Sequence, residues 1–214
     1  MKRLYAVAAT AALLCCGKSS SGPVYDGGIV GTPPAGQAGF SFAPADGAAL
    51  FVGPATCTQE GVTAQFTGLF LGFSGYSNVC GFMRTHGAQC ADVGKASTTF
   101  VGVVILKGAL GSVSAIGPGT YDVGEVTGTT EVTATGATVT VNDAACTNGG
   151  PDPSTNPVGG TLTITSASAG DVKGTVDLTW TGGGFSGPFE VIGCTTSVDV
   201  CGMLAGTAGC AGCF

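Results

Sequence analysis

Alternation of polar and apolar residues is the feature that narrows the possible folds of this chain most sharply. Thr161–Thr165 (TLTIT) alternates Thr with Leu or Ile, and Val172–Trp180 alternates again after the turn-like triplet Ala169–Asp171. A period of two places every second side chain on the same face of a β-strand. We therefore predict a β-hairpin here. Its apolar face would carry four side chains: Val172, Val176, Leu178 and Trp180.

Other β-forming segments recur along the chain, and no long segment has apolar residues at the spacing of a capped helix. Turns drawn from the 39 glycines separate these segments. Thr98–Lys107 (TTFVGVVILK) is apolar nearly throughout, which predicts a central strand covered on both faces. Short strands at this spacing predict an all-β fold, an antiparallel β-sandwich or an open barrel. The remaining predicted strands are Phe40–Ala43, Ala48–Val52, Thr63–Phe73, Thr120–Val123, Thr130–Val141 and Pro188–Ile192.

The N-terminal residues have the pattern of an export signal. A cationic head, Met1–Arg3, precedes the apolar run Leu4–Leu14, whose 11 residues are too few for a membrane-spanning helix of about 20. The run ends in Leu13-Leu14-Cys15-Cys16, which resembles the lipobox of bacterial lipoproteins. The resemblance implies that Cys16 is lipidated and becomes the first mature residue, although Cys15 stands where Gly, Ala or Ser is usual. A plain secretory signal with two incidental cysteines is the alternative.

The segment after this signal is dominated by Gly, Ser and Pro, a composition that stays flexible because it buries little apolar surface. We therefore expect a lipoprotein signal peptide (residues 1–15), a flexible tether (16–39), an all-β domain (40–194) and a Cys- and Gly-rich C-terminal extension (195–214). A lipid, a tether and a domain in this order predict a lipid-anchored protein of the cell envelope. We expect it at the outer membrane, facing the periplasm or exposed at the surface.

Charge restricts the partners. The chain has 7 Lys and Arg against 13 Asp and Glu, and loss of the signal would also remove Lys2 and Arg3. So few cations cannot neutralise a run of phosphates, so we expect no nucleic-acid partner. Charged residues form 9% of the chain, against a usual ~25%, which predicts a surface of Thr, Ser, Asn and Gly. The expected partner is the membrane, through the N-terminal lipid, and a protein or glycan partner stays open.

Five short motifs also occur in a characteristic order: Ser77–Cys80 (SNVC), Gly117–Val123 (GPGTYDV), Gly160–Ser166, Gly174–Leu178 and Ser186–Cys194. This order resembles a diffuse group of uncharacterised bacterial lipoproteins whose exported domains end in Gly-x-Phe and a cysteine. The resemblance spans most of the chain from the first motif to the last. It implies an exported all-β fold and no particular activity.

The cysteines predict disulfides. Beside Cys16, eight cysteines would remain in the exported chain, and an even number in an oxidising compartment is typical of disulfide-stapled domains. Two cysteine segments resemble each other: Val79–Met83, which precedes Cys90, and Val200–Leu204, which precedes Cys210. This similarity suggests the local pairs Cys80–Cys90 and Cys201–Cys210. The alternative is that the similarity of the two segments is a coincidence. The other candidates are Cys57, Cys146, Cys194 and Cys213. Cys210 and Cys213 have the spacing of a zinc-ligand pair, but the matching second pair is missing, so we expect no metal.

No catalytic constellation stands out. His86 is the only histidine, and the chain has no Gly-x-Ser-x-Gly motif that would place a nucleophile beside a base. We therefore predict a binding or structural module with no catalytic residue and no cofactor. An exported hydrolase is the main alternative, and an outer-membrane β-barrel is a more remote one, because the last ten residues lack bulky alternating side chains. Calcium binding by the oxygen-rich residues 142–156 stays open, although no EF-hand spacing is present.

Overall fold

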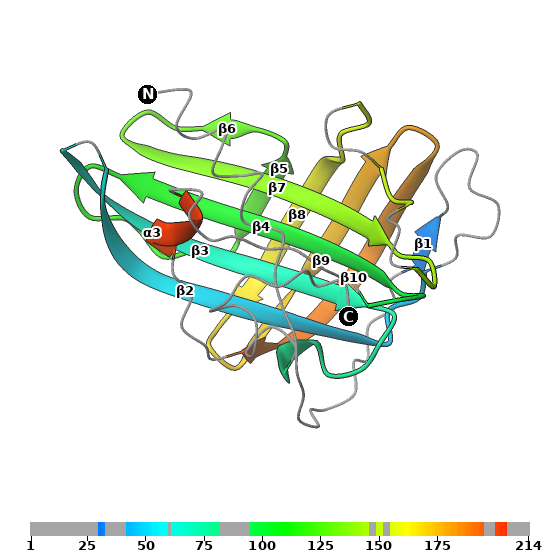
Figure 1. The fold of residues 1–214 in the computed structure, drawn as a ribbon. Coiled ribbons are helices and arrows are strands. Elements are labelled where there is room, and N and C mark those ends of the chain that lie inside the picture. Colours follow the sequence, from blue (N-terminus) through cyan, green and yellow to red (C-terminus); the bar gives the residue numbers. More distant parts are fainter. Residues whose placement is uncertain are drawn as a thin grey trace.

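Strands form most of the regular structure (Figure 1). The computed structural model describes residues 30–32, 42–59, 61–81, 95–145, 149–151, 155–194 and 200–204. Within this part, residues 79–81 form a helical turn. The elements are β1 (Val30–Thr32), β2 (Asp46–Gln59), β3 (Val62–Ser74), β4 (Thr99–Ala109), β5 (Gly119–Val123), β6 (Val126–Thr127), β7 (Glu131–Val141), β8 (Gly159–Ala167), β9 (Asp171–Trp180), β10 (Gly183–Cys194) and the helix α3 (Val200–Leu204).

These strands make one sheet in the order β5-β8-β9-β10-β2-β3-β4-β7-β6, and β1 pairs with β10 off this path. Every pairing is antiparallel except that of β10 with β2, which is parallel and short. We call this contact, Ile192–Cys194 of β10 beside Ala48–Leu50 of β2, the seam. The seam divides the sheet into one half with β5, β8, β9 and β10 and another with β2, β3, β4, β7 and β6.

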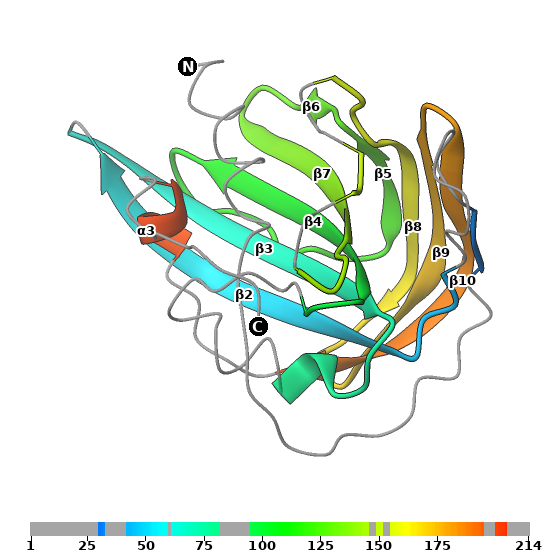
Figure 2. The same cartoon turned by 45° about the vertical axis from the view of Figure 1, so that its right-hand side comes forward.

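The sheet curls until its two halves face each other, and it stays open (Figure 2). The main core fills the space between the halves and includes Ile105 of β4 and Leu178 of β9, neither of which is exposed. The ring of Phe73 on β3 lies 5.5 Å from that of Phe185 and 5.6 Å from that of Phe189, both on β10. The fold is therefore all-β, and the expected open, barrel-like form is confirmed, with one parallel contact in an otherwise antiparallel sheet.

A second core covers the outer face of β2, β3 and β4. Leu50, Phe70 and Val104 project from this face and pack with Val79 of the helical turn and Val200 of α3. Because the first core covers the inner face of the same strands, β4 is buried at nearly every position. The prediction of a central strand covered on both faces is confirmed.

Glycines on this outer face make room for aromatic rings. Phe66 of β3 pairs with Gly108 of β4, and a Cβ atom added to Gly108 would lie 2.8 Å from the Phe66 ring. A Cβ atom on Gly72 would lie 2.9 Å from the ring of Phe100. Part of the high glycine content therefore serves close packing across neighbouring strands rather than turns.

The predicted hairpin is confirmed, since β8 and β9 pair antiparallel and the four predicted side chains are buried on one face of β9. The predicted strands Ala48–Val52, Thr63–Phe73, Thr120–Val123 and Pro188–Ile192 lie within β2, β3, β5 and β10, and the predicted strand Thr130–Val141 matches β7 except for its first residue. Their observed bounds extend one to several residues further at most ends.

Three short elements were not expected. Val30–Thr32 falls in the predicted flexible tether, yet it forms β1, because the exposed edge of β10 offers backbone partners to an extended segment of any composition. The other two are the helix α3, which lies in the predicted C-terminal extension, and the two-residue strand β6.

The predicted strand Phe40–Ala43 is wrong where the structure describes it, since Phe42 forms only an isolated bridge and Ala43 has no regular structure.

Candidate functional site

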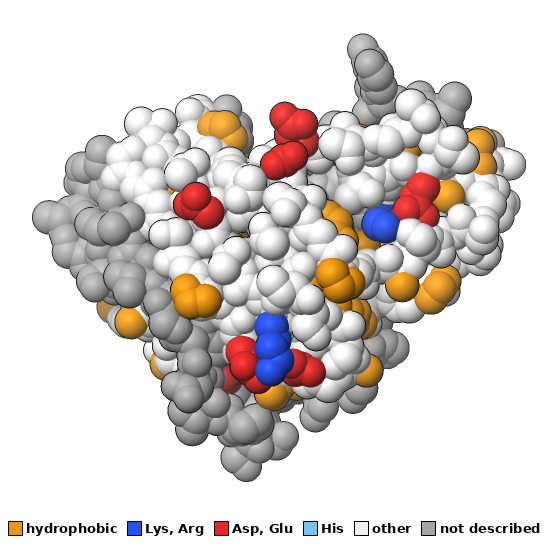
Figure 3. Space-filling view, turned by 180° about the vertical axis from the view of Figure 1, so that it is seen from behind, with side chains coloured by type: hydrophobic (Ala, Val, Ile, Leu, Met, Phe, Trp, Pro, Cys, Tyr) orange, Lys and Arg blue, Asp and Glu red, His pale blue; other side chains and the backbone are white. Residues whose placement is uncertain are grey.

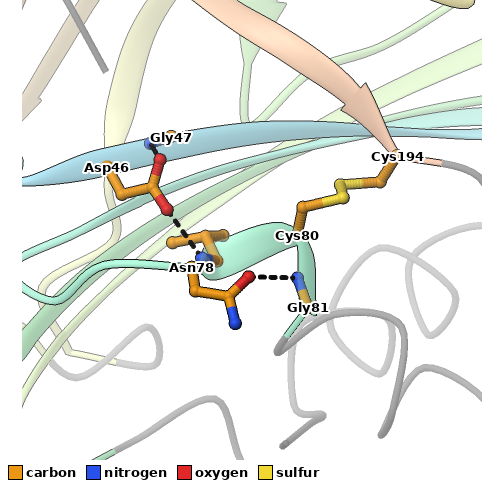
Figure 4. Close-up of a disulfide and its surroundings, with 7 residues drawn as sticks. Asp46, Gly47, Asn78, Cys80, Gly81 and Cys194 are labelled. Carbon is orange, nitrogen blue, oxygen red and sulfur yellow. Dashed lines mark hydrogen bonds between the residues drawn. A yellow bond between two sulfur atoms is a disulfide. The ribbon is translucent and has the colours of Figure 1, made fainter. Parts of the chain in front are cut away.

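A buried carboxylate organises the polypeptide that covers the outer face (Figure 4). Asp46, at the start of β2, is 5% exposed, and its two oxygens accept hydrogen bonds from the backbone N–H groups of Gly47 and Val79, each 2.8 Å long. Asn78 has a left-handed backbone (φ 71°), and its side-chain oxygen accepts a bond from the N–H of Gly81. Asp46 and Asn78 therefore satisfy N–H groups at the start of the helical turn, as capping residues do.

This turn carries the first disulfide. Cys80 is bonded to Cys194, the last residue of β10, with their Cα atoms 5.6 Å apart. Both cysteines are buried, at 7% and 3% exposure. Because Cys194 pairs with Leu50 in the seam, this disulfide fastens the helical turn to the junction between the two half-sheets.

The second disulfide joins α3 to the far part of the β2–β3 hairpin. We call residues 55–59 and 61–64 the arm, because β4 ends opposite Gln65 and only the two hairpin strands continue beyond it. Cys57 of the arm is bonded to Cys201 of α3, and both are partly exposed. The Sγ atom of Cys201 also lies 3.6 Å from the carbonyl oxygen of Thr56. Figures 1 and 2 show α3 beside β2 and β3 near the arm.

Disulfide stapling is confirmed, but both local pairings predicted from the sequence, Cys80–Cys90 and Cys201–Cys210, are wrong. Cys80 and Cys201 instead bond to residues 114 and 144 positions away. The similarity of the two cysteine segments has a different basis, because each forms a short helical segment over the outer face. The other candidates, Cys90, Cys146, Cys210 and Cys213, lie outside the described residues.

A second polar group lies on the inner side of the β4–β7 pair. The Nζ atom of Lys107 donates a hydrogen bond of 2.7 Å to the hydroxyl of Ser114 and lies 3.2 Å from a carboxylate oxygen of Glu131. The backbone N–H and the hydroxyl of Ser114 both donate to Glu131. The backbone N–H of Ser114, assisted by its hydroxyl and by Lys107, lowers the pKa of Glu131 from 4.5 to about 2.

This group brings a hydroxyl, an ammonium and a carboxylate together, and nucleophilic catalytic sites are built from groups of these kinds. Activation of a serine needs a base whose pKa lies near the working pH. Glu131, with a pKa of about 2, binds a proton too weakly for that role near neutrality. The contacts instead fasten the loop after β4 to the start of β7. Sequence reasoning missed the group because Ser114 and Glu131 lie 17 residues apart in no recognised motif.

Charged side chains are sparse on the face shown in Figure 3, where small red and blue groups stand apart among neutral atoms. One charged group joins two partly exposed residues of β9 to the exposed Glu190 of β10: Lys173 lies 2.6 Å from Glu190 and 3.4 Å from Asp171. The hydrogen bond to Glu190 raises the pKa of Lys173. Exposed ion pairs of this kind contribute little to stability.

The structure describes part of the segment considered for calcium. The amide nitrogen of Asn142 donates to the carbonyl of Lys95, and a carboxylate oxygen of Asp143 accepts from the N–H of Ala145. The side-chain oxygen of Asn156 accepts from the N–H of Thr181. These side chains therefore fasten loops to neighbouring backbone in the part of residues 142–156 that is described.

Several predicted residues lie outside the described part: the lipidation candidate Cys16, its neighbour Cys15, and His86. Among the described residues, no three His, Cys, Asp or Glu side chains gather as a metal site would require. In the same ranges no helix has the length and apolar character needed to cross a membrane. No protein-family model, curated protein or solved structure matches the chain.

Proposed function

We propose that this chain is an exported lipoprotein of the bacterial cell envelope, anchored by a lipid on Cys16, whose all-β domain acts as a binding or structural module. The anchor follows from the lipobox-like Leu13-Leu14-Cys15-Cys16. The domain would lie at the outer membrane, facing the periplasm or the cell surface.

The two disulfides are the observation that best supports export. They join residues 114 and 144 positions apart, so each closes a loop of more than half the chain. Disulfides form and persist in oxidising compartments such as the periplasm and are rare in the cytosol. Their position also fits a module that must keep its shape outside the cell, because both fasten covering segments to β2 and β10.

The role as a module rather than a hydrolase is supported by the state of the Lys107–Ser114–Glu131 group. Its serine is hydrogen-bonded to a carboxylate that is a poor base, and its lysine is paired with that same carboxylate. An exported hydrolase is the rival function, and His86 is the histidine that could serve as its general base. Activity on ester, peptide or glycoside substrates that disappears in His86→Ala, with the fold retained, would contradict a non-catalytic role.

The anchor is tested by growing cells that express the full chain with a labelled fatty acid. We expect label in the wild-type protein, recovery of that protein with membranes, and a mature N-terminus at Cys16. Cys16→Ser should lose the label and leave the membrane fraction. The matched control is Cys15→Ser, which places a residue usual in lipoboxes before Cys16 and should keep the label. Label retained in Cys16→Ser, or a mature N-terminus at another residue, would refute the anchor.

A further inference from the structure

Among the pairings between long strands of the described sheet, the seam is the shortest. β10 and β2 pair over only three residues each, whereas β9 and β10 pair over ten and β3 and β4 over ten. A parallel contact of this length supplies few hydrogen bonds between the half-sheets. Separation of β10 from β2 at the seam would therefore cost far less than separation of any long neighbouring pair.

The opposite side of the sheet is joined in a different way. β5 pairs with β8 of one half-sheet, and β6, which follows after Gly124 and Glu125, pairs with β7 of the other. The N–H of Gly124 donates to the carbonyl of Thr135, and the N–H of Thr135 donates to the carbonyl of Glu125. Gly124 and Gly128 have φ values of +89° and +87°, which other residues rarely adopt. The short segment between β5 and β6 thus crosses between the half-sheets opposite the seam.

Both disulfides lie on the seam side. Cys194 is itself a seam residue and is bonded to Cys80. The pairing of β10 with β2 has a constant offset of 144 positions, and the Cys57–Cys201 disulfide has the same offset. The helix α3, which follows β10 in the chain, therefore also contacts β2. One disulfide thus lies at the seam itself, and the other fastens α3 to the seam strand β2.

The two disulfides differ in exposure. Cys57 and Cys201 are partly exposed, whereas Cys80 and Cys194 are 7% and 3% exposed. A thiol reagent must reach a sulfur atom before it can exchange, so burial slows the reaction. The Cys57–Cys201 bond is open to attack in the folded protein, and the Cys80–Cys194 bond becomes open only when the cover of the outer face moves.

We propose that the two disulfides form a two-stage redox latch on the seam. In the first stage, an external dithiol reduces Cys57–Cys201 and frees α3 from the arm. In the second stage, reduction of Cys80–Cys194 frees the helical turn and lets the ends of β10 and β2 separate locally, while the inner core keeps the rest of the sheet together. At each stage a thiolate of the dithiol attacks one sulfur, its second thiol resolves the mixed disulfide, and two protein thiols and one oxidised dithiol result.

This latch goes beyond the lipid anchor and does not depend on it. The first test uses the full chain carrying Cys16→Ser, treated with dithiothreitol, quenched by an alkylating reagent at set times and mapped by mass spectrometry. We expect Cys57 and Cys201 to be alkylated about tenfold faster than Cys80 and Cys194, because accessibility governs exchange. Equal rates, or faster reaction of the buried pair, would overturn the proposed order.

The second test measures opening by hydrogen exchange. Relative to the oxidised chain, Cys57→Ser/Cys201→Ser should speed exchange in α3 and the arm and leave the seam protected. Adding Cys80→Ser and Cys194→Ser should speed exchange about tenfold or more at Ala48–Leu50 and Ile192–Cys194, with the β8–β9 hairpin unchanged. If the fourfold variant does not fold, fully reduced wild-type chain takes its place. The proposal would be wrong if hydrogen exchange became faster throughout the sheet, or if the seam stayed protected after both bonds are broken. Either result would show that the disulfides do not control local opening at the seam.

Discussion

The carboxylate of Asp46 accepts a hydrogen bond of 2.8 Å from the backbone N–H of Val79, 33 residues further along the chain. This contact joins the first residue of β2 to the helical turn that carries Cys80, and through Cys80 to the end of β10. One buried carboxylate therefore holds the cover of the outer face in the position where the disulfide can form.

Loss of this carboxylate should destabilise the domain. Asp46→Ala leaves the buried N–H of Val79 without its partner, and hydrogen bonds to charged groups contribute about 1.5–3 kcal/mol. We expect the free energy of unfolding in urea to fall by about 3 kcal/mol. Asp177→Ala, at an exposed position of β9, is the matched control and should change stability by about 0.5 kcal/mol or less. Equal effects of the two substitutions would show that Asp46 has no special structural role.

The two disulfides should contribute unequally to stability. Their loops are similar in length, 114 and 144 residues, so the chain-entropy contributions are nearly the same. Replacing Cys80 and Cys194 by Ala should cost about 2–5 kcal/mol and more than replacing Cys57 and Cys201, because the former pair is also buried in the outer core. Urea unfolding of both double variants measures the difference. A larger loss from the exposed pair would contradict the view that packing separates them.

Gly174 should not accept a side chain. It lies in β9 beside β8, and a Cβ atom there would lie 2.0 Å from the carbonyl oxygen of Thr163 and 3.0 Å from the ring of Phe189. Gly174→Ala must therefore push two strands apart, and we expect a loss of about 3 kcal/mol in the free energy of unfolding.

Gly53→Ala is the matched control for that substitution. No atom lies within 4 Å of the Cβ position at Gly53, so alanine should be tolerated or should stabilise by about 0.5 kcal/mol through a less flexible unfolded chain. A tolerated Gly174→Ala, measured by thermal or urea unfolding, would mean that β8 and β9 are less closely paired than described.

Local sequence patterns were sufficient to predict the regular part of the fold. The alternation in Val172–Trp180 and the apolar run Thr98–Lys107 each report the burial of their own strand, so β9 and β4 could be predicted without knowledge of the rest. The tether composition failed at Val30–Thr32, because pairing with β10 depends on an available edge and not on the residues themselves.

The candidate site could not be predicted, because its contacts link distant positions. Cys80 bonds to Cys194 and Asp46 caps a turn that begins 33 residues later, and neither relationship has a sequence period. The repeated Val-Cys-Gly of the two cysteine segments favoured local loops, whereas the sheet order brings each segment to β2 or β10. One signal was available: Asn78 stands three residues before Gly81, which is the spacing of a helix-capping side chain.

Acid should weaken the attachment of the loop after β4. The backbone N–H of Ser114 holds the pKa of Glu131 at about 2 in the folded chain, below its ordinary 4.5, so the ionised form stabilises the fold above pH 4.5. As the pH falls from 4.5 to 2, the carboxylate takes up a proton in the unfolded chain first, and this stabilisation is lost. We therefore expect wild type to be more stable than Glu131→Gln at pH 6, with the difference shrinking steadily towards pH 2. Urea unfolding across this range measures the difference, and an NMR titration of the Glu131 carboxyl measures its pKa directly. A difference that is constant with pH, or a pKa near 4.5, would show that Ser114 does not stabilise the ionised carboxylate.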